Sequence, residues 1–398
     1  MRFLMLNWRD PRNPRSGGAE RVTEGYLTAL AGRGHEVVWF ANRFAGASAE
    51  EFLNGVRLVR AGVLGSSVLE ARRWVRRQPC FDLVIDQHHG IPWYAPWWCG
   101  TRCVAYVHEV LGPIWRTFYR RPWSDIGRIQ ERWTHWLYRE VPFWTACEST
   151  RDGLRRHGVR RISILRYGVH TQALRVLNPK PLAQPLRLAV VTRLAPNKRV
   201  DHALSALRIL HRRGFGASMV VVGTGDGDAF LRQKAVDLGL RESVKFTGLL
   251  PEPEKDAILR EAHLLLHTSV REGWGLNVIE ANALGTPAVV YPVPGLIEST
   301  LHDQTGLVAE RETAEALADR VVELLADDAR YQRLRHQAWD RAKTMHWSQV
   351  LPPACDWLEA RARGEPLPAD DLVAAEAGGD SRDFGCVKPG DRGRTHLL

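Results

Sequence analysis

The sequence predicts an α/β protein that consists of two domains with parallel sheets. Strand-like apolar runs alternate with helical stretches in both halves of the chain, which is the pattern of parallel α/β folds. A chain of 398 residues is also longer than one ordinary hydrophobic core supports. Three prolines within residues 179–185 mark a linker between the halves. We therefore expect one domain over residues 1–175 and a second over residues 186–346.

The first domain is expected to begin with a strand and to continue as strand–helix units. Its predicted elements are strands at residues 3–7, 36–41, 83–86 and 103–108 and a helix at residues 19–32. A long stretch rich in Trp and Arg follows at residues 114–141, and Pro122 interrupts it.

The second domain opens on an apolar run directly after the linker. Its predicted strands are residues 186–192, 217–222, 244–247, 262–267 and 288–291, and its predicted helices are residues 200–212, 227–238, 276–284 and 313–326. A closing helix is predicted at residues 347–363. Residues 364–398 are dominated by Gly, Pro, Asp and Ala, so we expect a disordered tail there.

Positive charge is concentrated in the first half of the chain. Residues 1–170 contain 26 Arg, no Lys and 15 acidic residues, a net charge of +11, whereas the remainder is near neutral. The first domain is therefore expected to meet an anionic partner, such as a phosphorylated acceptor or a membrane surface. The aromatic residues at 93–98 and 114–141 fit two interpretations, contact with an apolar or sugar-like acceptor and contact with an anionic bilayer.

Neither a membrane-spanning helix nor a metal site is expected. No stretch approaches the roughly 18 consecutive apolar residues of a transmembrane helix, and the first residues carry charge too early for a signal peptide. We therefore expect a cytoplasmic protein, with the inner face of a membrane as an alternative place. Cys99 and Cys103 are the one close pair of cysteines, and no second pair completes a zinc set, so reduced thiols are expected.

Residues 269–285, which read SVREGWGLNVIEANALG, carry the strongest functional signal. Glu272 and Glu280 lie on either side of a turn broken by Gly273 and Gly275. A buried strand precedes the turn and a helix follows it, beginning near Leu276 and Asn277. The start of such a helix has free N–H groups and a positive dipole end, and glycine lets the backbone approach a ligand. The segment therefore predicts a phosphate site with Glu280 near ribose hydroxyls.

This segment resembles the Glu-x7-Glu signature of the retaining family 4 glycosyltransferases, and the likeness covers about residues 1–350. The resemblance implies the GT-B fold, in which two Rossmann-like domains face each other across a cleft and a C-terminal helix crosses back to the first domain. It implies that Glu280 binds the donor ribose and that Glu272 contacts the transferred sugar. The first domain would bind the acceptor and the second a nucleotide-sugar donor. No cofactor is implied.

Basic residues after the second domain's first strand fit a diphosphate. Arg193 and Lys198 are five residues apart across a turn, so both cationic groups are able to converge on one anion. The resemblance implies that they neutralise the donor diphosphate as it leaves.

Two glycine turns complete the predicted donor site. Gly17 and Gly18 lie between the first strand and the first helix and resemble the family's N-terminal Gly-Gly loop. Gly223 and Gly225 follow a strand of the second domain, in a spacing that is not the dinucleotide fingerprint, and the family uses this turn near the nucleotide.

His108 closes a predicted first-domain strand, where ligands bind in α/β folds. The resemblance implies that it touches the donor sugar, and we expect Glu109 and Trp115 near the acceptor. Two departures from the family pattern concern the interdomain surface and sugar selectivity: residues 167–170 read YGVH rather than NGVD, and Pro294-Gly295 followed by Glu298 replaces a Gly-Gly pair.

The prediction is thus a metal-independent, retaining glycosyltransferase. Its acceptor would be a small molecule, a glycan or a lipid-linked group, and front-face displacement would rely on electrostatic stabilisation. The alternatives are a GT-B epimerase or phosphorylase, a non-catalytic sugar-nucleotide sensor and, prompted by the basic first domain, a nucleic-acid-binding protein. No recognition motif supports nucleic acid, so it is not an expected partner.

Overall fold

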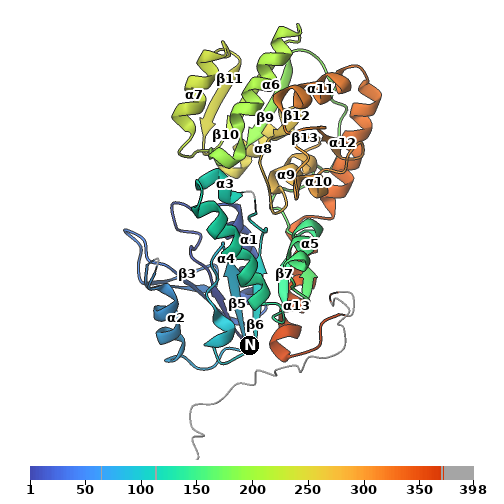
Figure 1. The fold of residues 1–398 in the computed structure, drawn as a ribbon. Helices are drawn as coiled ribbons and strands as arrows, with labels where there is room; N and C mark the ends of the chain where they lie inside the picture. Colours follow the sequence, from blue (N-terminus) through green and yellow to red (C-terminus); the bar gives the residue numbers. More distant parts are fainter. Residues whose placement is uncertain (64, 113, 369–370, 372–398) are drawn as a thin grey trace, which may run out of the picture.

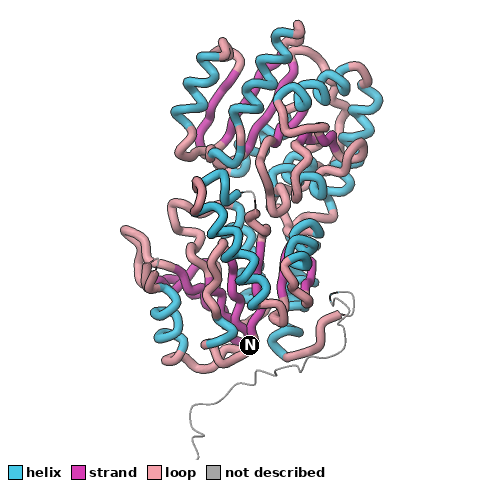
Figure 2. Tube along the Cα trace, viewed as in Figure 1, coloured by secondary structure: helices cyan, strands magenta, loops and turns pink. Residues whose placement is uncertain are grey.

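The computed structural model describes residues 1–63, 65–112, 114–368 and 371. Within these residues the chain forms two lobes, each built on a sheet that helices cover (Figures 1 and 2). Both sheets are parallel apart from one edge strand, so the predicted α/β class with two Rossmann-like domains is confirmed.

The N-terminal lobe contains an eight-stranded sheet in the order β3-β4-β2-β1-β5-β6-β7-β8, in which only the edge pair β3·β4 is antiparallel. The strands are β1 (Arg2–Leu6), β2 (Glu36–Ala41), β3 (Glu50–Leu53), β4 (Val56–Arg60), β5 (Leu83–His88), β6 (Cys103–Val107), β7 (Phe143–Thr145) and β8 (Ile162–Ile164). The helices are α1 (Gly18–Gly32), α2 (Ser67–Val75), the short η1 (Ala95–Trp97), α3 (Ile114–Phe118), α4 (Trp123–Leu137) and α5 (Glu148–Arg156).

The C-terminal lobe contains a six-stranded parallel sheet in the order β11-β10-β9-β12-β13-β14. The strands are β9 (Leu186–Val191), β10 (Ala217–Val222), β11 (Val244–Gly248), β12 (Leu264–His267), β13 (Ala288–Val290) and β14 (Gly306–Val308). The helices are η2 (Pro196–Lys198), α6 (Val200–Arg212), α7 (Asp228–Asp237), α8 (Glu252–Glu261), α9 (Leu276–Ala283), α10 (Leu296–Ser299), α11 (Ala314–Leu325) and α12 (Asp328–Lys343).

The sequences of the central strands explain why these strands are buried. β1 and β12 are apolar along most of their length, as expected for strands that are covered on both faces. Because neighbouring strands are parallel, their carboxyl ends lie at the same edge of each sheet. The loops after β1 and β6 in one lobe and after β9 and β12 in the other meet at the boundary between the lobes.

The helix α13 (Trp347–Arg363) leaves the C-terminal lobe and packs on the N-terminal lobe, which confirms the predicted crossover helix (Figure 1). The ring of Trp347 lies against Gly25 of α1 and Gly168. Arg33 of α1 forms ion pairs with Asp356 and Glu359 of α13, at 2.6 and 2.9 Å. The two lobes are therefore joined by packing as well as by the linker.

The Trp- and Arg-rich stretch folds as two helices, α3 and α4, and Pro122 stands at the N-cap of α4, where a missing N–H costs nothing. The sequence prediction missed several elements, namely α2, α5, α8, α10, α12, β3, β4, β7, β8 and β14. Five cysteines, Cys80, Cys99, Cys103, Cys147 and Cys355, are free thiols. The predicted tail lies almost wholly outside the described residues.

Candidate active site

The loop between β12 and α9 brings two predicted catalytic residues together. Glu272 in this loop accepts a hydrogen bond from the Lys198 ammonium at 2.5 Å, and Lys198 closes η2 on the neighbouring strand–helix connection. The Ser269 hydroxyl also donates to Glu272 at 2.7 Å, and Nε2 of His267 lies 3.5 Å from the same carboxylate oxygen. The carboxylate is thus held in place from three sides at the end of β12.

Glu272 is held in its ionised form. Burial raises the pKa of this carboxyl, but Lys198 and His267 together lower it by more, so the net shift is downward. Burial lowers the pKa of His267 to about 4, so this imidazole is neutral at pH 7. Glu272 and Lys198 therefore place an anionic hydrogen-bond acceptor beside a cation, an arrangement that suits sugar hydroxyls and phosphate.

Close backbone approaches explain the glycines of this loop. A Cβ on Gly273 would lie 2.6 Å from the carbonyl oxygen of His108 in the other lobe. Gly275 is the N-cap of α9 and has φ +89°, a conformation that favours glycine. At Gly295, which has φ +83°, a Cβ would lie 2.1 Å from the carbonyl oxygen of Glu272. The altered Pro294-Gly295 sequence thus keeps glycine where it supports Glu272.

Glu280 lies on α9 and forms an ion pair with Lys255 of α8 at 2.8 Å. Both residues are buried. Lys255 also donates to Glu252 at 2.6 Å, and Glu252 pairs with Arg21 of the N-terminal lobe at 2.8 Å. Burial lowers the pKa of Lys255, yet Glu280 and Glu252 raise it above its usual value, so Lys255 stays charged. Sequence reasoning missed Lys255, whose signal is a basic residue in the first turn of a helix that follows a strand.

The other donor-site residues surround the same loop. The Asn277 amide donates to the carbonyl of Val191 at 2.6 Å and so ties the start of α9 to the end of β9. A Cβ on Gly18 would lie 3.6 Å from the side chain of Leu276, which places the N-terminal glycine loop against α9. The preceding Gly17 donates its N–H to the Glu20 carboxylate at 2.7 Å.

The second glycine turn lies against the loop that carries Arg193. A Cβ on Gly223 or Gly225 would fall 1.9 or 2.3 Å from the carbonyl oxygen of Thr192 or Leu194, respectively. Close packing of these two backbones is therefore one reason for glycine here. Arg193 between them is exposed, and the described part of the chain shows no ion pair for its guanidinium.

His108 follows β6 and faces this assembly from the N-terminal lobe. Its Nδ1 lies 2.6 Å from the Tyr167 hydroxyl, and its Nε2 lies 2.7 Å from the amide nitrogen of Gln87. Burial lowers the pKa of His108 well below its usual value, with His89 and Arg9 adding to the effect, so the ring is neutral. Tyr167, part of the altered YGVH sequence, is thus a direct partner of the predicted site histidine.

Glu109 lies beside the ion pair of the other lobe. One of its carboxylate oxygens is buried without a hydrogen bond, 3.9 Å from the equally unpaired Nε of Arg271. Burial and the neighbouring Glu272 raise the pKa of Glu109 to about 7, against the opposing effect of Lys198. Sequence reasoning did not find Arg271, although it directly precedes Glu272.

The raised pKa of Glu109 predicts a pH-dependent stability. The folded-state pKa of Glu109 lies above its ordinary value of 4.5, so the folded protein holds this proton more tightly than the unfolded chain does. The contribution of Glu109 to the free energy of unfolding is therefore fully present below pH 4.5 and is lost as the pH rises through 7. We expect Glu109→Gln to gain up to about 3 kcal/mol relative to the native protein between pH 4.5 and 8. Urea unfolding at several pH values measures this difference. A constant difference across that range would show that Glu109 titrates normally.

Trp115 in α3 is mainly fixed by packing. A Cβ on Gly127 of α4 would lie 2.3 Å from the indole of Trp115, and the ring nitrogen donates to Glu131 at 3.3 Å. The helix α3 contacts η2, the segment that ends in Lys198. Trp115 therefore lies on a helix that borders the site, and its indole packs against α4.

A cavity of about 750 Å³ opens in the N-terminal lobe beyond the carboxyl ends of β1, β2 and β5. Its lining is basic and aromatic and includes Trp8, Arg9, Arg15, Arg43, Phe44 and His89. The rings of His89 and His108 are 5.7 Å apart, which connects the cavity with the predicted site.

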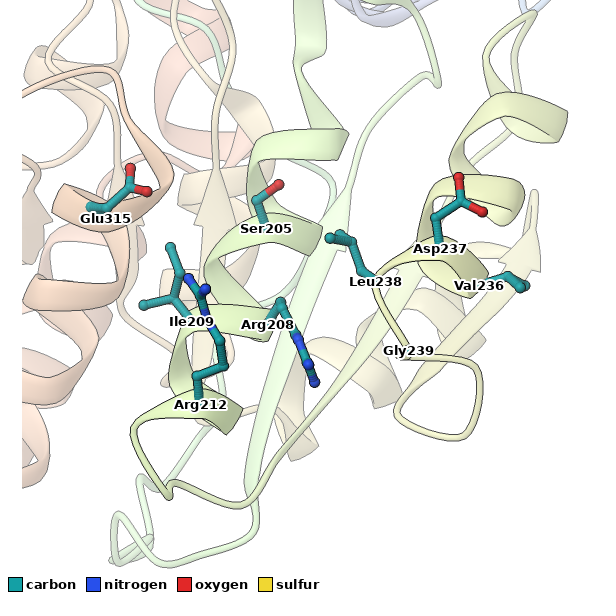
Figure 3. Close-up of a pocket in the computed structure, with 9 residues that line it drawn as sticks. All are labelled: Ser205, Arg208, Ile209, Arg212, Val236, Asp237, Leu238, Gly239 and Glu315. Carbon is teal, nitrogen blue, oxygen red and sulfur yellow. The ribbon is translucent and has the colours of Figure 1, made fainter.

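A second cavity, of about 470 Å³, lies elsewhere. Figure 3 shows Arg208 and Arg212 of α6 lining it, with Asp237 at the end of α7 and Glu315 on α11. Arg208 and Arg212 lie in the C-terminal half of α6, away from the carboxyl ends of the strands, and no residue that lines this cavity is a predicted site residue. We therefore place the candidate site at the lobe boundary.

Glu298, part of the second departure from the family pattern, joins the lobes directly. Its carboxylate accepts the backbone N–H groups of Glu148 and Ser149 at 2.7 and 2.8 Å. These groups are at the start of α5, where an acidic cap is favourable. Residues predicted from both domains therefore converge on one interface.

Comparison with known proteins agrees with this architecture. Residues 16–173 match the family described as Glycosyltransferase Family 4, and residues 178–341 match Glycosyl transferases group 1. The chain is 26% identical over 409 residues to a glycogen synthase of Mycobacterium tuberculosis, covering 94% of this chain and 99% of the relative. It is 34% identical over 144 residues to a GDP-mannose-dependent alpha-(1-6)-phosphatidylinositol monomannoside mannosyltransferase of the same species, covering 34% of this chain and 37% of the relative.

Solved structures share the fold at low sequence identity. HepE of Anabaena in complex with UDP and glucose superposes with a TM-score of 0.69 at 17% identity, covering 90% of this chain and 100% of that chain. Sucrose-phosphate synthase of Thermosynechococcus elongatus gives a TM-score of 0.72 at 17% identity, covering 92% and 100%. Two family matches that together span most of the chain, and the GT-B fold of both lobes, lead to one conclusion: the chain belongs to the family 4-like glycosyltransferases.

Proposed function

We propose that this glycosyltransferase moves a sugar from a nucleotide-diphosphate sugar to an acceptor hydroxyl with retention of the anomeric configuration. The observation that carries the proposal is the Lys198–Glu272 pair at 2.5 Å, beside the contact of Gly273 with His108. It combines a cation for a diphosphate with a carboxylate for sugar hydroxyls at the boundary of two lobes.

The diphosphate would lie between Arg193, Lys198 and the start of α9. Arg193 is exposed and available, and Lys198 would share its charge between Glu272 and the leaving phosphate. In front-face displacement, a phosphate oxygen takes the proton of the acceptor hydroxyl while the new glycosidic bond forms on the face that the diphosphate leaves. The positive charges then stabilise the departing group, and no protein-bound metal is needed.

The acceptor would enter the cavity of the N-terminal lobe. Its lining arginines favour an acceptor that carries an anionic group, and His89 places the cavity next to His108. Such acceptors fit the biosynthesis of glycans, glycolipids or glycosylated natural products. A sugar hydroxyl that reaches His108 would have to replace Gln87 at Nε2.

Calorimetric titration with UDP, GDP, ADP and dTDP identifies the donor base. A related solved structure holds UDP, and a relative is named for GDP-mannose, so these two bases are tested first. We expect one of the four diphosphates to bind in the presence of EDTA. We also expect the protein to hydrolyse the matching nucleotide sugar slowly, which releases that diphosphate. Proton NMR of the transferred sugar then reports the anomeric configuration.

Two results would overturn the proposal. Binding without any turnover of the nucleotide sugar would indicate a non-catalytic sensor. Absence of binding by all four diphosphates, together with salt-dependent binding of single-stranded oligonucleotides, would favour the nucleic-acid alternative.

A further inference from the structure

The helix α4 exposes its apolar side chains to solvent. Trp123 is 67% exposed, Ile126 51%, Ile129 70%, Trp133 51% and Trp136 51%. Their spacing of three or four residues places them along one face of the helix, and we call this set the apolar stripe. Five large apolar side chains that are each at least half exposed on one face of a helix indicate an interaction surface.

The buried face of the same helix is polar or small, the reverse of an ordinary surface helix. Its buried residues are Ser124, Gly127, Glu131, Thr134 and His135. Glu131 accepts the backbone N–H groups of Leu111 and Gly112 at 2.6 and 3.1 Å, so the polar face has a defined role in the lobe. The exposure of the apolar stripe is therefore built into the packing of α4 and cannot be relieved by rotating the helix.

Six arginines lie on α3, on α4 and in the residues that flank α4. They are Arg116, Arg120, Arg121, Arg128, Arg132 and Arg139. Asp125 lies 3.2 to 3.9 Å from Arg121, Arg116 and Arg128, and Glu140 lies 3.9 Å from Arg139, so the arginines outnumber the acidic groups beside them. Arg139 stacks over Trp136 at 4.5 Å. Guanidinium groups beside tryptophan rings match the headgroup region of a bilayer, where rings are partly buried and cations meet phosphate.

A second copy of the chain fits this face poorly. A two-fold contact would place the same surface of each copy against itself, and arginines would then face arginines. An anionic bilayer supplies both the apolar interior for the stripe and the opposite charge for the arginines. Among the described residues no helix is long and apolar enough to cross a membrane, so this contact would lie in the surface layer.

We propose that the α4 apolar stripe and its arginines form a docking surface for an anionic lipid bilayer. The position of α4 connects this surface with the active site. The neighbouring helix α3 packs on α4 and also contacts η2, which ends in Lys198 (Figure 1). A bilayer against α4 would therefore lie close to the mouth of the site and present a lipid-borne acceptor there.

Vesicle sedimentation tests the proposal. We expect the full chain to bind phosphatidylcholine vesicles that contain about a third phosphatidylglycerol, to bind pure phosphatidylcholine vesicles at least tenfold more weakly, and to lose affinity with added salt. Ile129→Gln with Trp133→Gln should reduce the partition coefficient at least tenfold. Arg128→Glu with Arg132→Glu should have a similar effect on the anionic vesicles.

Matched controls separate docking from general stickiness. Phe230→Gln with Val236→Gln changes two exposed apolar residues of α7, at 61% and 51% exposure, and should leave vesicle binding unchanged. Binding of the nucleoside diphosphate should be the same in all variants, so the outcome is independent of the proposed function. Equal binding by native protein and stripe variant would overturn the proposal. So would a native dimer, seen by sedimentation velocity, that the stripe variant converts to a monomer without any vesicle binding.

Discussion

Replacing Lys198 by alanine is expected to lower kcat for sugar transfer by about a hundredfold to a thousandfold. The ammonium lies 2.5 Å from Glu272 and is only 17% exposed, so solvent cannot supply the lost charge. The substitution removes a cation that stabilises the leaving diphosphate, and this charge develops mostly in the transition state. Initial rates at saturating donor and acceptor measure the effect, and KM for the donor should change much less than kcat.

The control is Lys245→Ala, which removes an exposed lysine from β11 of the same lobe and should leave kcat within about twofold. The double variant with Glu272→Gln decides whether Lys198 acts on the diphosphate or only neutralises Glu272. If the double variant recovered native activity, the role of Lys198 would be to neutralise the carboxylate. If kcat of Lys198→Ala stayed within threefold of native, the proposed diphosphate role would be wrong.

The apolar pattern of the sequence was sufficient to predict the fold class and several of its elements. β2, β10 and α13 have the predicted bounds. β2 and β10 are apolar runs with few polar interruptions, and α13 carries buried apolar residues at helical spacing, among them Ala354, Trp357 and Leu358. α12 was missed because its inner face is not apolar alone. Arg335 is buried there and donates to the carbonyl of Gly285 at 2.9 Å, a contact that local pattern cannot reveal.

The candidate site shows the same division. The Glu-x7-Glu spacing and the two basic residues after β9 could be found in the sequence because each lies at a strand–helix junction, where ligands bind. The partners of these residues could not. Lys255 reaches Glu280 from another helix, and the contact of His108 with Gly273 joins two lobes. Such pairings depend on how the sheets are placed, which residue spacing does not encode.

Replacing Glu280 by alanine is expected to weaken binding of the nucleoside diphosphate by about tenfold to a hundredfold, the value of a hydrogen bond to a charged group. Glu280 is buried on α9 and holds Lys255 at 2.8 Å, so one of its oxygens is already occupied by a cation. The ribose hydroxyls would use the remaining lone pairs. Calorimetry with the diphosphate that binds the native protein measures the change.

The 2′,3′-dideoxy form of the same diphosphate is the matched ligand. If Glu280 binds the ribose hydroxyls, the dideoxy form should bind the native protein as weakly as the ribose form binds Glu280→Ala, and the substitution should then cost it little. Lys255→Met tests the alternative that the ion pair only orients α8 against α9, because it keeps the carboxylate and removes its cation. Equal losses for the ribose and dideoxy forms in Glu280→Ala, matched by Lys255→Met, would assign Glu280 to the support of the lobe and not to the nucleotide.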